Sequence, residues 1–328
     1  MDSKPGKPYF FFITLMRALA AIVITNAHYT GIYPSDMIAN GGLLGDVMFF
    51  SVSGFCLANP KEPFIKWYPK RLWRIYAVVW VITLAFVVLG VYHINSLTDG
   101  VIAFLHPTYY HFVASITLLY IPLYFVARSI DLNRKNYAFL AIGLFVAQMI
   151  FYGLLYDRTY YHIDTVREPM IEFIFFQSML LGLFLRKEFT ERQTSNQGTQ
   201  SILLWGLLIL ALGGYFASKM LFVKRDSLSD YQILNQVILY VALFLLFCCL
   251  QSLEGRLKTL SNKKIWKIVV FLSDHTLEIY CVQYVIIEWV RNMGLPFPLN
   301  WLILTTMIIL SATALRWVSQ KLIKLVKI

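Results

Sequence analysis

Long runs of apolar residues alternate with short polar segments along almost the whole chain. A helix needs about 17–25 apolar residues to cross the hydrocarbon core of a bilayer, and such windows can be placed ten times in this sequence. The ten predicted spans cover residues 9–29, 41–58, 75–92, 111–128, 137–156, 169–185, 202–218, 232–251, 268–290 and 300–318. We therefore predict an all-α, polytopic membrane protein, with residues 1–328 forming a single transmembrane domain and no appended soluble domain.

Basic residues in the connecting segments indicate the orientation of these spans. If both termini are cytoplasmic, the inward-facing segments hold most of the 29 lysines and arginines, and loops retained on the cytoplasmic side usually carry such an excess. The topology accounts for the net charge of +11. We therefore expect a lipid bilayer around the protein and no nucleic-acid partner.

Composition narrows the class of protein further. With 58% hydrophobic and 14% charged residues, the chain does not resemble a soluble globular domain.

The first apolar run contains Arg17 and has no small-x-small cleavage site directly after it, which predicts a permanent span and no cleaved signal peptide. The cysteines lie inside predicted spans at Cys56, Cys248, Cys249 and Cys281, so we expect neither disulfides nor a metal site.

Arg17 and His28 lie eleven residues apart in the first predicted span. At 3.6 residues per turn this spacing places both side chains on one helix face, roughly 16 Å apart along the axis. Burying an arginine near the middle of a bilayer costs at least about 2.5–3.5 kcal/mol on insertion scales, so an intramembrane arginine is a functional candidate by default. We predict that this pair belongs to a functional site.

The second predicted span is interrupted by small and polar residues. Three glycines, two serines and Asp46 fall within residues 41–55, and small residues let a second helix or a thin ligand approach the backbone closely. Asp46 is predicted at about the same depth as His28, and a carboxylate there would orient the imidazole and stabilise its protonated form. Tight helix packing, and an Asp46 that only solvates the outward helix end, are the alternative interpretations.

A basic and aromatic segment, residues 66–76, precedes the third predicted span. Lys70, Arg71 and Arg74 crowd it beside Trp67 and Trp73. Arginine forks suit phosphate groups, and an aromatic ring can stack on a base. Ordinary positive-inside anchoring with interfacial tryptophans is the alternative. We interpret the segment as a cytoplasmic turn that binds phosphate.

These three stretches together resemble the acyltransferase 3 family of membrane proteins, which transfer acyl groups from coenzyme A to extracytoplasmic carbohydrates. The resemblance rests on Arg17 and His28 with ten residues between them, on Gly45, Phe49-Phe50 and Ser53-Gly54-Phe55, on the basic Lys70-Arg71 and Arg74, and on the late segment Asp274–Gln283. The late segment departs from the family pattern, because Gln283 stands where histidine is usual, and Lys70 replaces one arginine.

The resemblance implies an integral membrane O-acetyltransferase that uses cytoplasmic acetyl-CoA and modifies a hydroxyl of an extracytoplasmic polysaccharide, such as capsule, O-antigen or exopolysaccharide. It also implies a multi-pass location in a cell membrane, typically the bacterial cytoplasmic membrane. The expected catalytic residues are His28, Arg17 and Asp46, and the donor-binding residues are Lys70, Arg71, Arg74, Ser53 and Gly54. His28 is expected to act as general base, with a covalent acetyl-histidine as the second mechanism.

The acceptor side carries weaker signals. Residues 109–111 and 157–168 are predicted outward and hold aromatic and acidic side chains suited to a sugar, although an interfacial aromatic belt explains them equally well. Glu278 and Glu288 are candidate counter-ions for Arg17. A glycan transporter is the competing function, but transporters tend to contain matched repeats with broken helices, and no repeat is visible. A structural scaffold leaves the cost of Arg17 unexplained.

Overall fold

The computed structural model describes residues 9–105, 110–165, 169–192 and 202–326, and all regular structure in these ranges is helical. The elements are α1 (Phe11–Ala27), α2 (Gly42–Leu57), α3 (Phe64–Val88), α4 (Leu97–Phe104), α5 (His111–Ser129), α6 (Arg134–Leu154), α7 (Met170–Arg192), α8 (Ile202–Lys224), the 3-10 helix η2 (Asp226–Tyr231), α9 (Ile233–Ser252), α10 (Glu254–Leu260), α11 (Lys264–Asp274), α12 (Thr276–Asn292) and α13 (Leu299–Leu325).

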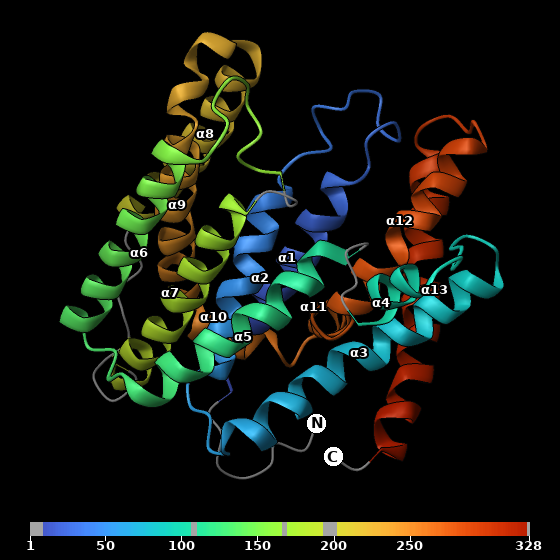
Figure 1. Ribbon diagram of the computed structural model, residues 1–328, viewed down its shortest axis with the longest axis horizontal. Helices are drawn as coiled ribbons and strands as arrows, with labels where there is room; N and C mark the ends of the chain where they lie inside the picture. The colour runs from blue at the N-terminus through green and yellow to red at the C-terminus, as the bar shows by residue number, and fades with distance from the viewer. Residues whose placement is uncertain (1–8, 106–109, 166–168, 193–201, 327–328) are drawn as a thin grey trace.

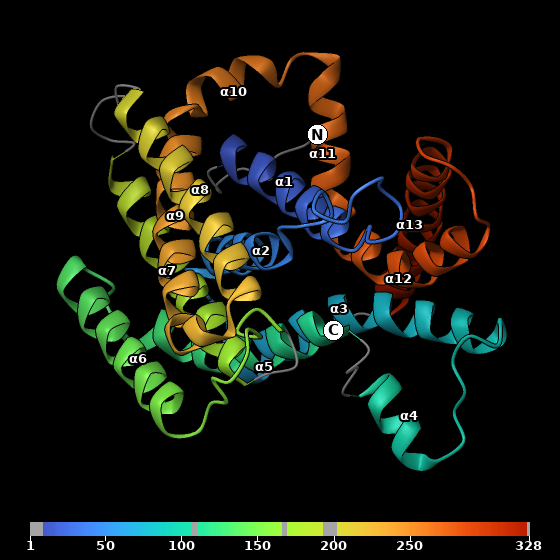
Figure 2. The same cartoon turned by 90° about the horizontal axis from the view of Figure 1, so that it is seen from above.

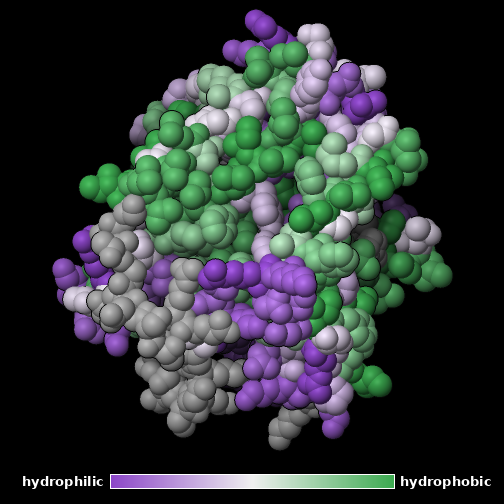
Figure 3. All heavy atoms as spheres, turned by 90° about the vertical axis from the view of Figure 1, so that its left-hand side faces the viewer, coloured by the Kyte–Doolittle hydropathy of each residue, from purple (hydrophilic) through white to green (hydrophobic). Residues whose placement is uncertain are grey.

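The described helices support a multi-pass membrane protein. Six of them are long and apolar enough to cross a bilayer, namely α3, α5, α6, α8, α9 and α13, and α1 and α2 are apolar but shorter. Large apolar side chains on the outer helices α6 and α8 are exposed, including Phe139 and Leu210, and a hydrophobic band lies above a hydrophilic region on this side of the molecule (Figure 3). The count of ten spans and the cytoplasmic side of the termini stay predictions.

Several loops of the described chain lie at two opposite edges of the molecule (Figure 1). The loop after α1, the segment after α6 and the turn between α12 and α13 lie at the upper edge, which we call the upper face. The loops between α2 and α3 and between α5 and α6 lie at the lower edge, the lower face. The topology predicted from charge makes the lower face cytoplasmic.

Helix α2 lies at the centre of the bundle, between α1 and α7 (Figure 2). Gly54 and Gly182 bring α2 and α7 into backbone contact, because an added Cβ at Gly54 would overlap the Met179 carbonyl and one at Gly182 would overlap the Ser51 carbonyl. Gly45 does the same for α1, since its Cβ would lie 2.6 Å from Cγ1 of Ile24. The glycines of α2 therefore serve close helix packing.

The N-terminus of α1 is held by a carboxylate from a distant element. Oε1 and Oε2 of Glu254, the first residue of α10, accept hydrogen bonds from the amides of Phe11 and Phe12 at 2.9 and 2.8 Å. The first amides of a helix have no partner within it, and the preceding residue, Phe10, offers no side-chain cap. Glu254 therefore fixes the lower end of the helix that carries Arg17 and His28.

The segment 66–76, which we predicted as a turn, is instead part of α3. The helix starts directly after Pro63, whose carbonyl accepts hydrogen bonds from the amides of Lys66 and Trp67 at 3.0 and 2.9 Å. Pro69 lies in the second turn, where the missing amide removes only one helical hydrogen bond. Lys70 and Arg74 consequently share one helix face four residues apart.

The predicted span 268–290 is two helices, because the chain breaks at His275 between α11 and α12. His275 Nδ1 lies 2.8 Å from the Phe271 carbonyl, and the Thr276 hydroxyl donates to the carbonyls of Leu272 and Ser273 at 3.1 and 2.9 Å. Polar side chains that bond to the nearby backbone compete with regular helix. Polar residues inside an apolar run therefore mark a break here.

We predict that Gly54→Ala destabilises the protein, because the new methyl group must push α7 away from α2. The expected loss lies at the upper end of the roughly 1–3 kcal/mol typical of overpacking. The matched control is Gly143→Ala on α6, where no atom lies within 4 Å and alanine favours helix by up to about 1 kcal/mol. Thermal unfolding in detergent measures both; equal melting temperatures would contradict the packing role.

Candidate active site

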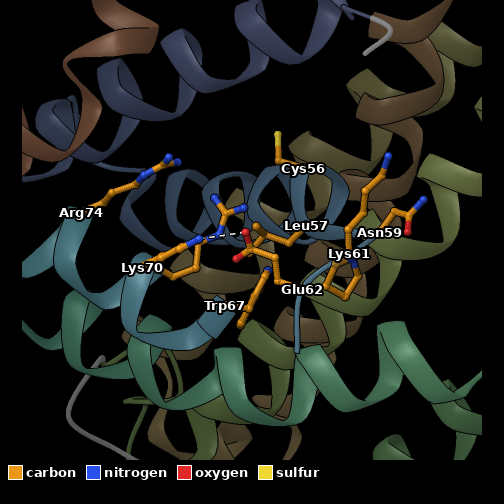
Figure 4. Close-up of a pocket in the computed structure, with 10 residues that line it drawn as sticks. Cys56, Leu57, Asn59, Lys61, Glu62, Trp67, Lys70 and Arg74 are labelled. Atoms are coloured by element: carbon orange, nitrogen blue, oxygen red, sulfur yellow. Dashed lines mark hydrogen bonds and ion pairs between the residues drawn. The ribbon is translucent and has the colours of Figure 1, made fainter. Parts of the chain in front are cut away.

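A cavity of about 340 Å³ opens at the lower face between the end of α2 and the start of α3. We call it the basic cavity. Its lining includes Lys61, Glu62, Trp67, Lys70, Arg71, Arg74 and Cys56. Figure 4 shows Lys70 and Arg74 projecting from α3, with Lys70 joined to Glu62. The structure thus brings the three predicted phosphate-binding residues into one hollow.

One of the cations in the basic cavity is neutralised by an acid, whereas two arginines are not. Lys70 Nζ donates to Glu62 Oε1 at 2.8 Å, and this hydrogen bond lowers the pKa of Glu62. Arg71 stacks over the Trp67 ring, 5.7 Å from its centroid, and lies close enough to Arg74 for the two charges to repel each other. Among the described residues neither arginine has an ion-pair partner, so the cavity favours an anion.

Cys56, in the last turn of α2, lines the basic cavity and is exposed. Three guanidinium groups act electrostatically on its thiol, those of Arg17, Arg71 and Arg186. Arg186 of α7 stacks on the ring of Phe10, with 4.3 Å to its centroid. The predicted intramembrane Arg17 therefore lies within electrostatic range of Cys56, although it is not among the residues that line the cavity.

Ser53 and Gly54, the other predicted donor-binding residues, have structural partners. The hydroxyls of Ser53 and Tyr120 lie 3.0 Å apart, and Tyr120 in turn interacts electrostatically with Arg71 and Arg17. Gly54 faces the backbone of α7. Ser53 can therefore influence the cavity through Tyr120, whereas Gly54 acts through helix packing.

A second cavity, of about 320 Å³, lies at the upper face, and we call it the upper cavity. His28, the C-terminal cap of α1, and Asp46, in the first turns of α2, both line it. Its wall also includes Asn40, Phe112, Asp164, Thr165, Lys219, Tyr280 and Tyr284. His28 and Asp46 therefore share one hollow, as their predicted depth suggested.

The hydrogen bond of the His28 ring is made to a tyrosine. Nε2 lies 3.2 Å from the Tyr284 hydroxyl of α12, and the two rings pack edge to face at 4.7 Å. Within the described chain no hydrogen bond joins His28 to Asp46, whose side chain is buried. Tyr284 orients the ring in the way we predicted for Asp46, and the catalytic role of Asp46 stays a prediction.

A third cavity, of about 510 Å³, meets the upper cavity at His28 and Tyr284. We call it the side cavity; Thr30, Glu288 and Arg291 line it. Arg291 donates to the Thr30 carbonyl at 2.8 Å and so holds the loop that follows His28. Glu288, one of the predicted counter-ions of Arg17, thus lies in the side cavity, at the opposite end of α1 from Arg17.

The other predicted counter-ion, Glu278, is bound by a different arginine. Nη1 of Arg316 from α13 lies 3.4 Å from Glu278 Oε1 and also donates to the Asp274 carbonyl, while Arg17 acts on Glu278 only through its electrostatic field. Gln283 of the late motif is fully buried. The late motif therefore includes an ion pair that our sequence analysis missed.

Tyr284, Asn40, Lys219 and Arg186 were also missed. Lys219 and Arg186 were counted only as loop charges, although both lie inside helices. Of the predicted acceptor loops, Tyr109 and residues 166–168 lie outside the described residues. Within residues 157–165, Asp164 reaches the upper cavity.

Comparison with known proteins identifies the protein family. A family model described as an acyltransferase domain, that of the acyltransferase 3 family, matches residues 10–318. No curated protein and no solved structure matches the chain significantly.

The helical bundle, its apolar spans and this match define a membrane-embedded acyltransferase. The chain belongs to the acyltransferase 3 family, because the match covers nearly its whole length. The predicted resemblance and the predicted enzyme class are confirmed.

We predict that a membrane-impermeant maleimide modifies Cys56 in preference to the other cysteines, because Cys56 is exposed whereas Cys248 is half-buried and Cys249 and Cys281 are buried. The reagent should label inverted membrane vesicles. It should not label intact, right-side-out cells. Cys56→Ser should reduce labelling to background, whereas Cys249→Ser, the matched control, should leave it unchanged. Labelling from the outer side alone would place the basic cavity on the wrong side of the membrane.

Proposed function

We propose that the protein is an O-acetyltransferase that moves an acetyl group from cytoplasmic acetyl-CoA to a hydroxyl of an extracytoplasmic polysaccharide. The observation that carries this proposal is the pair of cavities at opposite faces, one basic and one lined by His28, with α1 between them. The family match supports acyl transfer in general. The donor, the acceptor and the role of His28 are our inferences.

The basic cavity suits the nucleotide part of coenzyme A. Coenzyme A carries a 3′-phosphate and a pyrophosphate, and arginine binds phosphate through two parallel hydrogen bonds. Arg71 and Arg74 have no acid partner among the described residues, and Trp67 offers a ring beside Arg71. An anionic donor would relieve the repulsion between the two arginines, which supports donor binding over simple anchoring in the membrane interface.

The two cavities are linked by the length of α1. Arg17 and His28 are separated by about 16 Å along a helix axis, a distance that an extended pantetheine arm is long enough to span. In our proposal the arm passes Cys56 and Arg17 and brings the thioester to His28. Arg17 would hold a carbonyl or phosphate oxygen of the donor on the way.

At the upper face, His28 would act as general base. The imidazole takes the proton of the acceptor hydroxyl as its oxygen attacks the thioester carbonyl. A carbon–oxygen bond forms, the carbon–sulfur bond breaks, and the proton passes to the departing thiolate, which leaves as coenzyme A. Tyr284 fixes the ring through Nε2, so Nδ1 is the nitrogen left for the acceptor. Such base catalysis typically contributes about 10²- to 10⁴-fold.

We predict that His28→Ala abolishes polysaccharide acetylation. Cells that lack the gene are complemented with wild type or variant at matched membrane abundance, and proton NMR measures O-acetyl groups on the surface polysaccharide. The variant should lose about 10²-fold or more in rate, which removes the acetyl signal. The matched control is His93→Ala, because His93 is exposed and lines none of the three cavities. Full acetylation by His28→Ala would refute the general-base role.

We also predict that Arg71→Gln and Arg74→Gln weaken donor binding. Acetyl-CoA should protect Cys56 from maleimide, and each variant should raise the half-protecting concentration by about tenfold or more, since hydrogen bonds to charged groups contribute about 1.5–3 kcal/mol. Lys264→Gln is the matched control, because Lys264 is exposed outside the cavity. Acetyl-pantetheine, which lacks the nucleotide phosphates, should protect all variants alike. Protection by acetyl-CoA that is equal in all variants would exclude these arginines.

A further inference from the structure

A half-buried ion pair lines the same upper cavity as His28, and neither our proposed mechanism nor our sequence analysis uses it. Lys219 Nζ of α8 lies 2.6 Å from Asp164 Oδ2, with only 22% and 19% of the two side chains exposed. Lys219 also donates to Asn40 Oδ1 at 3.3 Å. These three groups come from α8, from the segment after α6 and from the loop before α2. The fold therefore brings residues from three distant segments together at the wall of the upper cavity.

The segment that carries Asp164 is held by buried amide side chains. Gln232 Oε1 accepts hydrogen bonds from the amides of His162 and Ile163, both at 3.0 Å, and its Nε2 donates to the Tyr160 carbonyl. Gln236 Nε2 donates to the Ile163 carbonyl at 3.0 Å. Both glutamines are almost completely buried. Their hydrogen bonds therefore hold the backbone of residues 160–163 against the start of α9.

The amide chain continues into the bundle. Gln148 of α6 donates to Gln236 at 2.6 Å, and Gln177 of α7 donates to Gln148 at 3.0 Å. Fully satisfied buried polar networks rigidify the structure around them. Four glutamines from α6, α7 and α9 with its N-cap therefore hold the segment that carries Asp164 in place, which is how preorganised binding groups are built.

The remaining wall suits a sugar. Phe112, Tyr280 and Tyr284 supply aromatic surface, and Asn40 and Thr165 supply neutral polar groups. Two carboxyl groups, Asp46 and Asp164, oppose one ammonium group in the lining, so the cavity has no surplus positive charge for an acidic sugar. A volume of about 320 Å³ lies within the usual range of small ligand pockets.

We propose that the upper cavity is the acceptor subsite, in which Asp164, Lys219 and Asn40 bind the hydroxyls of a neutral sugar unit and present one hydroxyl to His28. This inference rests on the proposed function and deepens it. The side cavity also reaches His28, but only the upper cavity combines the buried acid Asp46 with a wall fixed by the amide network. The side cavity would admit the rest of the polymer.

The test uses the enzyme in lipid nanodiscs, radiolabelled acetyl-CoA, and surface polysaccharide isolated from host cells that lack the gene. Asp164→Asn and Lys219→Met should raise the KM for polysaccharide about tenfold or more, because each removes a charged hydrogen-bonding group, and should leave the KM for acetyl-CoA unchanged. The matched control is Asp230→Asn, from the exposed Arg158–Asp230 pair outside the cavity. If Lys219→Met does not accumulate, Asp164→Asn, which keeps the size of the side chain, carries the test.

The outcomes separate this inference from the proposed function. No acetyl transfer by wild type would overturn both. Transfer by wild type with an unchanged polysaccharide KM in both variants would overturn the subsite alone, as would an increase caused only by Glu288→Gln in the side cavity. Proton NMR of the product locates the acetyl group, and acetylation of an acidic sugar unit would overturn the preference for a neutral one.

Discussion

The close contact of α2 with α7 determines where every other part of the site can lie. Gly54 and Gly182 each face a backbone carbonyl of the opposite helix, so the two helices cannot shift without a clash or a void. Because α1 packs on the other side of α2 through Gly45, these three helices form one unit. Asp46 at one end of α2 and Cys56 at the other therefore hold fixed positions, and each lines a different cavity.

The ionisable side chains of the bundle are placed around the unit formed by α1, α2 and α7. The bilayer penalises isolated ionisable groups, and several of those described here line the two cavities or pair with each other. Arg71 and Arg74 line the basic cavity. Asp164 and Lys219 pair at the upper cavity, and Arg316 binds Glu278 between α12 and α13. Arg17 is the one cation within α1. In our proposal this distribution serves a negatively charged donor on one side and a neutral acceptor on the other.

Much of this arrangement could be predicted from the sequence because the cost of burying a charge is visible there. Arg17, His28 and the basic group at residues 70–74 stood out against apolar surroundings, and the same argument applied to Arg316 would have found the ion pair with Glu278. Hydrophobic runs alone did not reveal the break at His275, because it depends on side chains bonding to their own backbone. Tyr284 and the Asp164–Lys219 pair depend on contacts between distant segments, so no local pattern marks them. Gly54 packs against the Met179 carbonyl, and its predicted contact with the donor stays a prediction.

We propose that the acetyl group crosses the membrane through this protein, from the basic cavity to His28. Proteoliposomes with uniform orientation test this directly, with labelled acetyl-CoA confined to the side of the basic cavity and polysaccharide to the side of His28, and protein-free liposomes as the control for leakage. We expect acetylated polysaccharide in this arrangement and none when the two compartments are exchanged. Acetylation that requires donor and acceptor on the same side would contradict it.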